Sequence, residues 1–515
     1  MKKLVLDGQH LTIEQVVQVA RTQPGEIAVT LSADSRQAVA RASQAVAQIV
    51  AEGRVVYGIN TGFGAFKNTT IPKNALRQLQ INIVRSHSAG TGAPLETEVV
   101  RAMMLVRANT LASGYSGVRP ETIDLLLQML ERGVHPVVPR QGSLGASGDL
   151  APLAHIALVM IGEGEAWFRG EKMDGAQALA RAGLSPIQLA PKEGLALTNG
   201  TAFMVALGCL AVDEAENAIF AANVAGALTL EALHGTPAAF DARIHAVRPH
   251  PQQVATARIM RELLQDSDFV RGTPSEDPQD AYSLRCIPQV HGACADAVQK
   301  ARQVVSIELN SVTDNPLIFF EEDGTPVALS GGNFHGEPLA IAYDHLALAM
   351  TELGNISERR LNRMTDRASN GGLLPAFLTE YGGLNSGFMI TQYTAAALAS
   401  ENKALCFPAS ADSIPTSANV EDHVSNGPIS GRQARRVLRN LEQILGIELM
   451  AAAQAIDFRK NALGNEVHLG QGTAPVYQLL RQHIPFIPQD AMMSPYMALA
   501  AKLVRSGQVR QVIKQ

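Results

Sequence analysis

The sequence predicts an all-α protein built from long, closely packed helices, and three observations support this. The chain has 515 residues, of which 46% are apolar and 18% charged, enough apolar material for a large core. Glycine is abundant (43 residues) and only 5% of the residues are aromatic, a composition that favours close-packed helices joined by glycine-rich loops. The alternating strand–helix rhythm of a doubly wound sheet is missing.

The N-terminal part is expected to be α-rich. Residues 1–55 predict a short strand followed by two helices, and Thr12 with Gln15 has capping-box spacing in front of an apolar-periodic run. Glycine-punctuated loops follow at 54–67 and 136–150, and a third surrounds Asn199. We therefore expect an N-terminal domain over residues 1–205 that carries the functional loop.

Long helices are expected to dominate the rest of the chain. Helical patterns cover 202–234, 292–310, 338–364, 388–405 and 433–459. Gly235 is expected at the C′ position of the first helix, Pro338 suits a first helical position, and Ser430 with Gln433 repeats the capping-box spacing. At 1.5 Å per residue such helices span roughly 30–40 Å. They predict a central helical bundle over residues 206–515, with a C-terminal closing segment.

Composition excludes several classes of function. The net charge is −5 and no basic block stands out, so nothing favours nucleic acid or an anionic membrane as a partner. The cysteines form neither a C-x-x-C pair nor a Cys/His cluster, so no metal is expected and the thiols are expected to stay reduced: Cys209, Cys286, Cys294 and Cys406. The first apolar run is too short for a signal peptide, which predicts a soluble, cytoplasmic protein.

The segment Gly142–Leu150, with the sequence GSLGASGDL, is the most informative stretch. One interpretation is a tight turn into a helix, with Ser147 or Asp149 as the N-cap. A nucleophile elbow fits less well, because Gly148 follows Ser147 directly. A third interpretation is a backbone cyclisation, in which the Gly148 amide attacks the Ala146 carbonyl and two water molecules leave. The product would be an electrophile that replaces a bound cofactor.

Motifs spread along nearly the whole chain resemble, in order, those of the aromatic amino acid ammonia-lyase family, and most closely its histidine branch. They are Tyr57–Gly64 (YGINTGFG), Ser86–Gly90 (SHSAG), Gly142–Leu150, Leu197–Thr201 (LTNGT), Tyr282–Arg285 (YSLR), Thr313–Pro316 (TDNP), Gly331–His335 (GGNFH) and Glu421–Ser425 (EDHVS). Each motif alone is weakly specific, but all of them in order are strongly specific.

The resemblance implies a fold like the fumarase and aspartase bundles and a homotetramer whose active sites combine loops from several subunits. It also implies that Ala146, Ser147 and Gly148 form 4-methylidene-imidazol-5-one (MIO), with no external cofactor and no metal. The catalytic group that it implies is Ala146, Ser147, Gly148, Tyr57, Tyr282 and Glu421. The substrate-binding group is His87, Asn199, Gln279, Arg285 and Phe334.

Individual roles follow from the same resemblance. Tyr57 matches a lid tyrosine that takes the β-proton, Tyr282 a second active-site tyrosine, and Arg285 a clamp for the substrate carboxylate. If their segment is helical, Tyr282 and Arg285 share a face at i, i+3. Without the motifs, a packed loop tyrosine and a surface arginine would be the simpler interpretations.

Three further positions have equally ordinary alternatives. Asn199 matches an asparagine that holds the electrophile; the alternative is an ordinary Asn-Gly turn. Phe334 matches an aromatic that packs beside the electrophile; the alternative is that Phe334 is an ordinary core phenylalanine. Gln279 matches a position that hydrogen-bonds near the substrate carboxylate and the tyrosines; the alternative is that its side chain is simply exposed to solvent.

Substrate choice depends on two positions. His87 matches the residue that meets the substrate ring, and Glu421 matches a glutamate typical of histidine-specific members. Both can hydrogen-bond an imidazole and gain little from a phenyl ring. Ile287 and Val420 replace glutamines usual in the histidine branch and favour an aryl substrate. We therefore predict conversion of L-histidine to trans-urocanate and ammonia, with tyrosine or phenylalanine ammonia-lyase, an aromatic aminomutase or a non-catalytic scaffold as alternatives.

Overall fold

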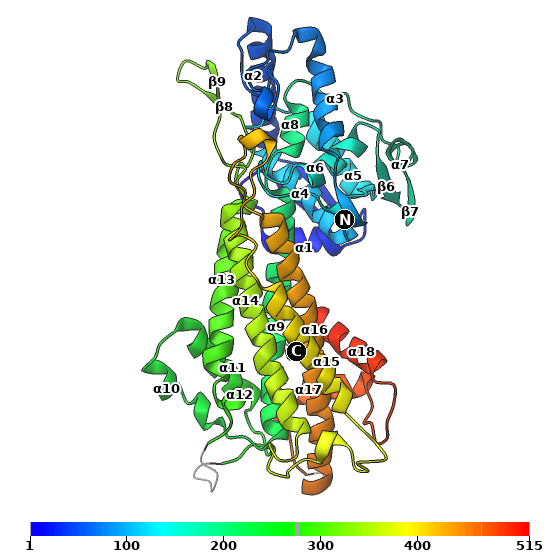
Figure 1. The fold of residues 1–515 in the computed structure, drawn as a ribbon, viewed down its shortest axis with the longest axis vertical. Helices are drawn as coiled ribbons and strands as arrows, with labels where there is room; N and C mark the ends of the chain where they lie inside the picture. The colour runs from blue at the N-terminus through cyan, green and yellow to red at the C-terminus, as the bar shows by residue number, and fades with distance from the viewer. Residues whose placement is uncertain (1, 273–278, 465, 514–515) are drawn as a thin grey trace. The chain divides into compact units, whose positions relative to one another are not determined.

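The computed structural model describes residues 2–272, 279–464 and 466–513 and is mainly helical (Figure 1), which confirms the predicted fold class. The chain forms two compact units. The first contains Met1–Asp213, Ala301–Asp344 and Pro408–Arg432, and the second contains Glu214–Lys300, His345–Phe407 and Gln433–Gln515. The first unit thus includes two later segments as well as all of the domain expected over residues 1–205. The predicted domain boundary itself stays a prediction.

The first unit begins with β1 (Lys2–Leu6), α1 (Ile13–Arg21), β2 (Ile27–Leu31) and α2 (Ala33–Glu52). The Thr12 capping box is confirmed, because the Thr12 side chain accepts from the Gln15 amide and the Gln15 side chain accepts from the Thr12 amide. The sequence analysis did not expect β2, which pairs in parallel with β1 from Lys2–Ile27 to Leu6–Leu31. Its five residues show too little alternation to stand out as a strand.

The rest of the first unit is a set of helices with small sheets, built around α4 (Thr97–Ala112), which is buried from Val99 to Ala112. Its other helices are η1 (Gly64–Phe66), η2 (Lys73–Ala75), α3 (Leu76–His87), α5 (Pro120–Arg132), α6 (Ala151–Met160), α7 (Gly175–Arg181), α8 (Glu193–Thr198) and η5 (Ser417–Asn419). Its other strands are β3 (Thr91–Pro94), β4 (His135–Pro136), β5 (Pro139–Gln141), β6 (Glu165–Phe168), β7 (Glu171–Asp174), β8 (Leu317–Phe320) and β9 (Pro326–Leu329). The sheets are β3–β5, β4–β6–β7 and the hairpin β8–β9.

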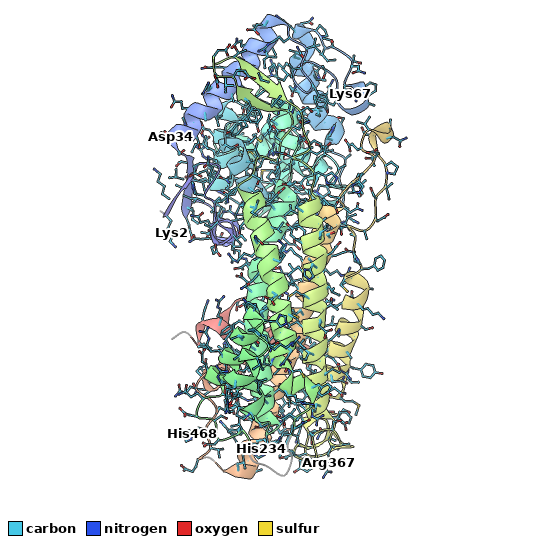
Figure 2. The ribbon with its side chains drawn as sticks, turned by 90° about the vertical axis from the view of Figure 1, so that its left-hand side faces the viewer. Lys2, Asp34, Lys67, His234, Arg367 and His468 are labelled. Carbon is cyan, nitrogen blue, oxygen red and sulfur yellow. The ribbon has the colours of Figure 1, made fainter. Side chains whose placement is uncertain are left out.

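The second unit is a bundle of long helices that lie side by side in both ribbon views (Figures 1 and 2). It contains α15 (Met389–Leu405) and parts of α9 (Ala202–Ala232), α13 (Ile287–Leu309), α14 (Glu337–Thr365) and α16 (Gly427–Leu463). Shorter helices complete it: η3 (Pro237–Phe240), α10 (Ala242–Ala246), α11 (Pro251–Leu263), α12 (Tyr282–Arg285), η4 (Ala376–Leu378), α17 (Ala474–His483), α18 (Ser494–Arg505) and α19 (Gln508–Gln511). Small residues permit the close packing: a Cβ added at Gly446 would lie 2.6 Å from the Ala501 nitrogen.

The five predicted long helices are confirmed, with two corrections at their ends. Ser430 is not a cap, because α16 already begins at Gly427 and the Ser430 amide donates to the Asn426 carbonyl (3.0 Å). At the end of α9, His234 and not Gly235 adopts the left-handed conformation (φ 53°). Gly235 follows it and donates to the Leu230 carbonyl (2.8 Å), as in a Schellman motif.

Within the described part of the chain, no helix combines the length and apolar character needed to cross a membrane.

Candidate active site

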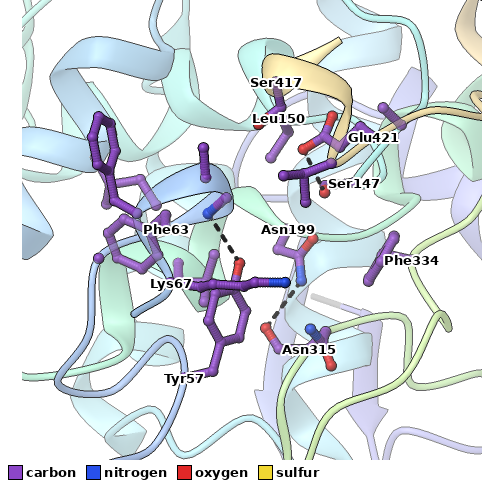
Figure 3. A pocket seen from close by; sticks show the side chains of 18 of the residues that line it. Tyr57, Phe63, Lys67, Ser147, Leu150, Asn199, Asn315, Phe334, Ser417 and Glu421 are labelled. Carbon is purple, nitrogen blue, oxygen red and sulfur yellow. Dashed lines mark hydrogen bonds between the residues drawn. The ribbon is translucent and has the colours of Figure 1, made fainter. Parts of the chain in front are cut away.

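Seven of the predicted site residues line one cavity of about 940 Å³ in the first unit (Figure 3). They come from loops and helix ends that are far apart in the sequence: Tyr57, His87, Ala146, Ser147, Asn199, Phe334 and Glu421. The surface that lines the cavity is mainly apolar, as is usual for a small-molecule site, although many of the lining residues have polar or charged side chains. The cavity therefore brings together most of the site that the motifs indicate.

The Ala146–Gly148 turn is held against the segment that contains Asn199. Gly148 has a left-handed backbone (φ 72°) and forms a parallel bridge with Gly200. A Cβ at position 148 would lie 2.2 Å from the Gly200 carbonyl oxygen, so only glycine fits there. Ala146 is buried while Ser147 lines the cavity. This arrangement gives small residues on both sides of Ser147, as a compressed turn requires.

Asp149 fixes the other end of this turn. Its carboxylate accepts hydrogen bonds from the backbone amides of Phe203 and Met204 and thus caps α9. The sequence analysis considered Ser147 or Asp149 as the cap of the helix that follows directly, and this was wrong: no side chain caps α6. Burial raises the pKa of Asp149 to about 8, against the lowering effect of the two amide hydrogen bonds.

Glu421 lies beside Ser147 on the cavity wall (Figure 3). The Ser147 hydroxyl donates to Glu421 Oε1 (3.2 Å), and Thr416 Oγ1 donates to Glu421 Oε2 (3.3 Å). The intervening loop contains three consecutive residues with positive φ, at 417–419. This conformation returns the chain so that Thr416 pairs with Glu421 across it. The carboxylate is thereby held beside the turn that is predicted to form the electrophile.

Tyr57 reaches the cavity from the loop before η1, and its hydroxyl accepts from the Gly64 amide (3.4 Å). Burial raises the pKa of Tyr57, and the Glu421 charge raises it further although the Gly64 hydrogen bond opposes this. Tyr57 is therefore a neutral phenol at pH 7 in this state. Lys67 is a cation on the same cavity wall (Figure 3).

His87 lies at the end of α3 with its Nδ1 atom 3.0 Å from Ser86 Oγ. Burial lowers its pKa, although the Ile83 carbonyl and the Glu421 charge act in the opposite direction. The imidazole is accordingly uncharged at neutral pH, and a neutral ring can donate through one nitrogen and accept through the other.

The Asn199 side-chain amide is anchored from behind. Its Nδ2 atom donates to Asp314 Oδ1 and to the Asn315 carbonyl, both at 3.2 Å. Asn315 Oδ1 in turn accepts from the Gly331 amide (2.8 Å), which ties this segment to the loop that carries Phe334. Figure 3 shows Asn199 between Ser147 and Asn315, with its nitrogen toward Asn315. Its carbonyl oxygen is the atom that these contacts leave for the cavity.

Three predicted residues lie elsewhere: Tyr282, Arg285 and Gln279 belong to the second unit and do not line this cavity. Tyr282 is 72% exposed and Gln279 is also exposed. The predicted i, i+3 relation is confirmed, because Tyr282 and Arg285 form the single turn α12. The Arg285 guanidinium lies 4.6 Å from the centre of the Tyr282 ring.

Sequence reasoning missed several wall residues, among them Lys67, Asn315, His335 and His423. His335 and His423 had a signal, since both lie inside quoted motifs. Together with Glu337 they bring three potential metal-ligand atoms within 4.8 Å. Both His335 nitrogens already have partners, since Nδ1 accepts from the Glu337 amide and Nε2 lies 3.3 Å from the His423 carbonyl. His335 is thus held in place by hydrogen bonds within the chain.

The helical fold and the Ala-Ser-Gly turn facing a tyrosine, an asparagine and a glutamate define a lyase of aromatic amino acids. The family model for aromatic amino acid lyases matches residues 11–482, and the chain belongs to this family.

The chain is 58% identical to a histidine ammonia-lyase of Chloroflexus aurantiacus over 509 residues, covering 99% of this chain and 97% of that protein. Its fold is similar to the crystal structure of a histidine ammonia-lyase from Trypanosoma cruzi (TM-score 0.91, 42% identity, 99% of this chain and 95% of the other). A tyrosine aminomutase of Streptomyces globisporus is also similar (TM-score 0.93, 39% identity, 99% and 98%).

Proposed function

We propose that this protein is a histidine ammonia-lyase, a carbon–nitrogen lyase that converts L-histidine to trans-urocanate and ammonia. The observation that carries this proposal is the presence of Glu421 and His87 on the wall of the cavity that also contains Ser147. A carboxylate and a neutral imidazole can both hydrogen-bond the substrate ring. The identity to histidine ammonia-lyases over the whole chain supports the same substrate.

The residues of the turn fit the formation of MIO from Ala146, Ser147 and Gly148. The Gly148 amide would attack the Ala146 carbonyl, one water would leave from the new ring and one from Ser147. A glycine is sterically required at position 148, Ala146 has only a methyl group, and the Ser147 hydroxyl contacts a carboxylate. The ring supplies the electrophilic carbon that ordinary side chains lack. No external cofactor is part of this proposal.

The chain's own groups would manage the protons. Tyr57 Oη takes the β-proton of the substrate, and its raised pKa means that it needs nearby positive charge to do so. The substrate ammonium brings such a charge into the cavity. Arg285 clamps the substrate carboxylate, a task that suits a guanidinium, and Tyr282 and Gln279 complete that end of the site.

We further propose a homotetramer in which the second unit of one subunit completes the cavity of another. The exposed Tyr282 and Gln279 support this, since neither lines the cavity of its own chain. Helices α14 and α15 expose large apolar side chains in the second unit, including Leu348 (56%), Ile390 (63%) and Tyr393 (69%). Apolar surface of this kind indicates a protein interface. The expected cytoplasmic location stays a prediction.

A tyrosine or phenylalanine ammonia-lyase, or an aromatic aminomutase, is the second candidate. It is favoured by Val420, which lines the cavity and offers no hydrogen bond to an imidazole. Ile287 adds little to it, because its side chain is buried in the second unit, where a Cβ on Gly226 would lie 2.9 Å from it. One of the two glutamine replacements thus bears on the cavity of this chain.

The test is to incubate the full-length protein separately with L-histidine, L-tyrosine and L-phenylalanine and to follow the unsaturated product and free ammonia. We expect urocanate and ammonia from histidine, with much slower release from the other two. Faster release of coumarate or cinnamate would overturn the substrate assignment. A β-amino acid product without net ammonia release would instead identify an aminomutase.

A further inference from the structure

A fully buried ion pair lies directly behind Asn199. Lys192 Nζ donates to Asp314 Oδ2 at 2.6 Å, and both side chains have 0% exposure. Asp314 uses its other oxygen, Oδ1, to accept from Asn199 Nδ2 (3.2 Å) and from the Asn315 amide (2.7 Å). The pair and Asn199 thus form one continuous chain of hydrogen bonds that ends at the cavity wall.

The backbone around α8 positions Lys192 for its ion pair with Asp314. Lys192 and Asn199 are the residues immediately before and after α8. Lys192 has a left-handed conformation (φ 75°), which a side chain adopts only at an energetic cost, on the order of 1 kcal/mol or more. That conformation places its side chain against a carboxylate 122 residues further along the chain. The short helix α8 therefore joins the buried lysine to the asparagine of the site.

The charge of Asp314 and the Asn315 carbonyl together favour one orientation of the Asn199 amide. Burial alone would raise the pKa of Asp314, but Lys192 and Arg107 outweigh it and hold the pKa below its ordinary value. An ionised carboxylate only accepts hydrogen bonds. It holds the Asn199 nitrogen, whereas a flipped amide would place two oxygens against each other. The Asn199 carbonyl consequently stays turned to the side of Ser147, as Figure 3 shows.

We propose that Lys192 and Asp314 are positioning residues for the reaction: they fix the orientation of Asn199 and so present an acceptor, not a donor, toward the turn that forms the electrophile. This inference rests on the proposed function, because it gives the pair a role in histidine turnover. Neither residue touches the substrate, and both act through Asn199.

The main test replaces the pair by apolar residues, Lys192→Met with Asp314→Leu, in the full-length chain. Removing both charges leaves the net charge of the buried site unchanged, and Arg107 keeps its electrostatic interaction with Asp149. Either single change would instead alter the buried net charge. We expect kcat for histidine to fall about 10- to 100-fold, as loss of an outer partner does, with KM little changed. In an Asn199→Ala background the same pair of changes should cost little more, because all three residues act as one unit.

The matched control is the buried pair of the second unit, changed by Arg360→Met with Glu448→Met, since both its side chains also have 0% exposure. It should lower the unfolding temperature without changing kcat per folded molecule. The two-water mass loss of the peptide that contains Ala146–Gly148 should be complete in the Lys192/Asp314 variant. Its absence there would overturn the proposal, because the pair would then act on ring formation.

Wild-type kcat in the Lys192/Asp314 variant, or additive effects with Asn199→Ala, would also overturn it. If that variant does not fold, Lys192→Met with Asp314→Asn removes the same two charges, keeps the volume of residue 314 and decides the question. Its neutral hydrogen bond should cost about fivefold in kcat, and no loss would refute a positioning role. Failure of the wild-type protein to release urocanate is a separate result, which would refute the proposed function itself.

Discussion

The pairs Lys192–Asp314 in the first unit and Arg360–Glu448 in the second are equally buried, yet their remaining hydrogen bonds go to different places. Glu448 also accepts from Thr229 and Ser357, and every one of these groups belongs to the helical bundle. Asp314 instead bonds Asn199, a residue of the cavity wall. The hydrogen bonds of the Arg360–Glu448 pair stay within the bundle. Those of the Lys192–Asp314 pair reach Asn199, which lines the cavity.

This difference predicts which substitutions change the stability of the protein and which change its turnover. Removing buried polar groups inside the bundle should change stability and leave the chemistry of a folded molecule intact. Removing polar groups of the first unit that face the cavity should change turnover with a smaller effect on stability.

The largest effect is expected for Ser147→Ala. Without the hydroxyl no water can be lost from residue 147, so the exocyclic electrophile cannot form. We expect kcat to fall by a factor on the order of 10³ or more, since a group that makes covalent catalysis possible is lost. Circular dichroism and the unfolding temperature should match the wild type, because the single contact of Ser147 to Glu421 is at the cavity surface. Turnover near the wild-type rate would contradict the origin of the electrophile in the chain itself.

The second prediction tests whether the two units of one subunit serve different sites. Tyr282→Phe changes the second unit and Ser147→Ala the first, and each alone should be inactive or nearly so. When the two variants are produced together, mixed tetramers contain cavities with an intact Ser147 and a partner's intact Tyr282. We expect activity to reappear in the purified mixture, measured as urocanate release.

The control for this experiment combines Ser147→Ala with Tyr57→Phe. Both residues line the cavity of the same unit, so mixing these variants leaves every cavity defective. Equal recovery in both mixtures, or none in either, would contradict the proposed exchange of residues between subunits.

The motifs predicted the members of the candidate site, but not which of them line a cavity of one chain. Tyr57, Ser147, Asn199 and Glu421 were named from the family resemblance of their motifs, and the fold gathers them in one cavity. Motif order says nothing about which copy of the chain supplies a residue. Tyr282 was expected in the bundle over residues 206–515, and the structure adds that it does not line the cavity of its own chain.

Local signals predicted helices well because their causes are local, as the Thr12 capping box and the apolar periodicity of α9 and α16 illustrate. Contacts between distant residues could not be predicted in this way. Asp149 caps a helix that begins more than 50 residues later, and Lys192 pairs with Asp314 across 122 residues. A single sequence contains no signal for such partners, because each of them looks like an ordinary polar residue in its own segment.

A smaller effect is expected for Glu421→Gln, which keeps the volume and removes the charge. Hydrogen bonds to a charged group contribute about 1.5–3 kcal/mol and neutral ones about 0.5–1.5 kcal/mol. The change should therefore lower kcat/KM for histidine about tenfold more than it lowers any residual rate with tyrosine. Parallel kinetics with both substrates measure this ratio. An equal loss of kcat/KM with both substrates would show that Glu421 contributes to the reaction but does not recognise the imidazole ring.

The smallest effect concerns the bundle, where it should alter stability alone. Burial raises the pKa of Glu231 to about 7, although hydrogen bonds from the Gly470 amide and Ser267 oppose the rise. A carboxyl whose folded-state pKa exceeds its unfolded value stabilises the fold fully below the unfolded pKa, and this contribution is lost as the pH rises through about 7. The free energy of unfolding should thus fall between about pH 4.5 and pH 7 through this group. Glu231→Gln should remove that part of the slope in urea unfolding curves, with kcat for histidine unchanged. A variant with the wild-type pH slope, or with reduced kcat per folded molecule, would break the separation between the bundle and the cavity.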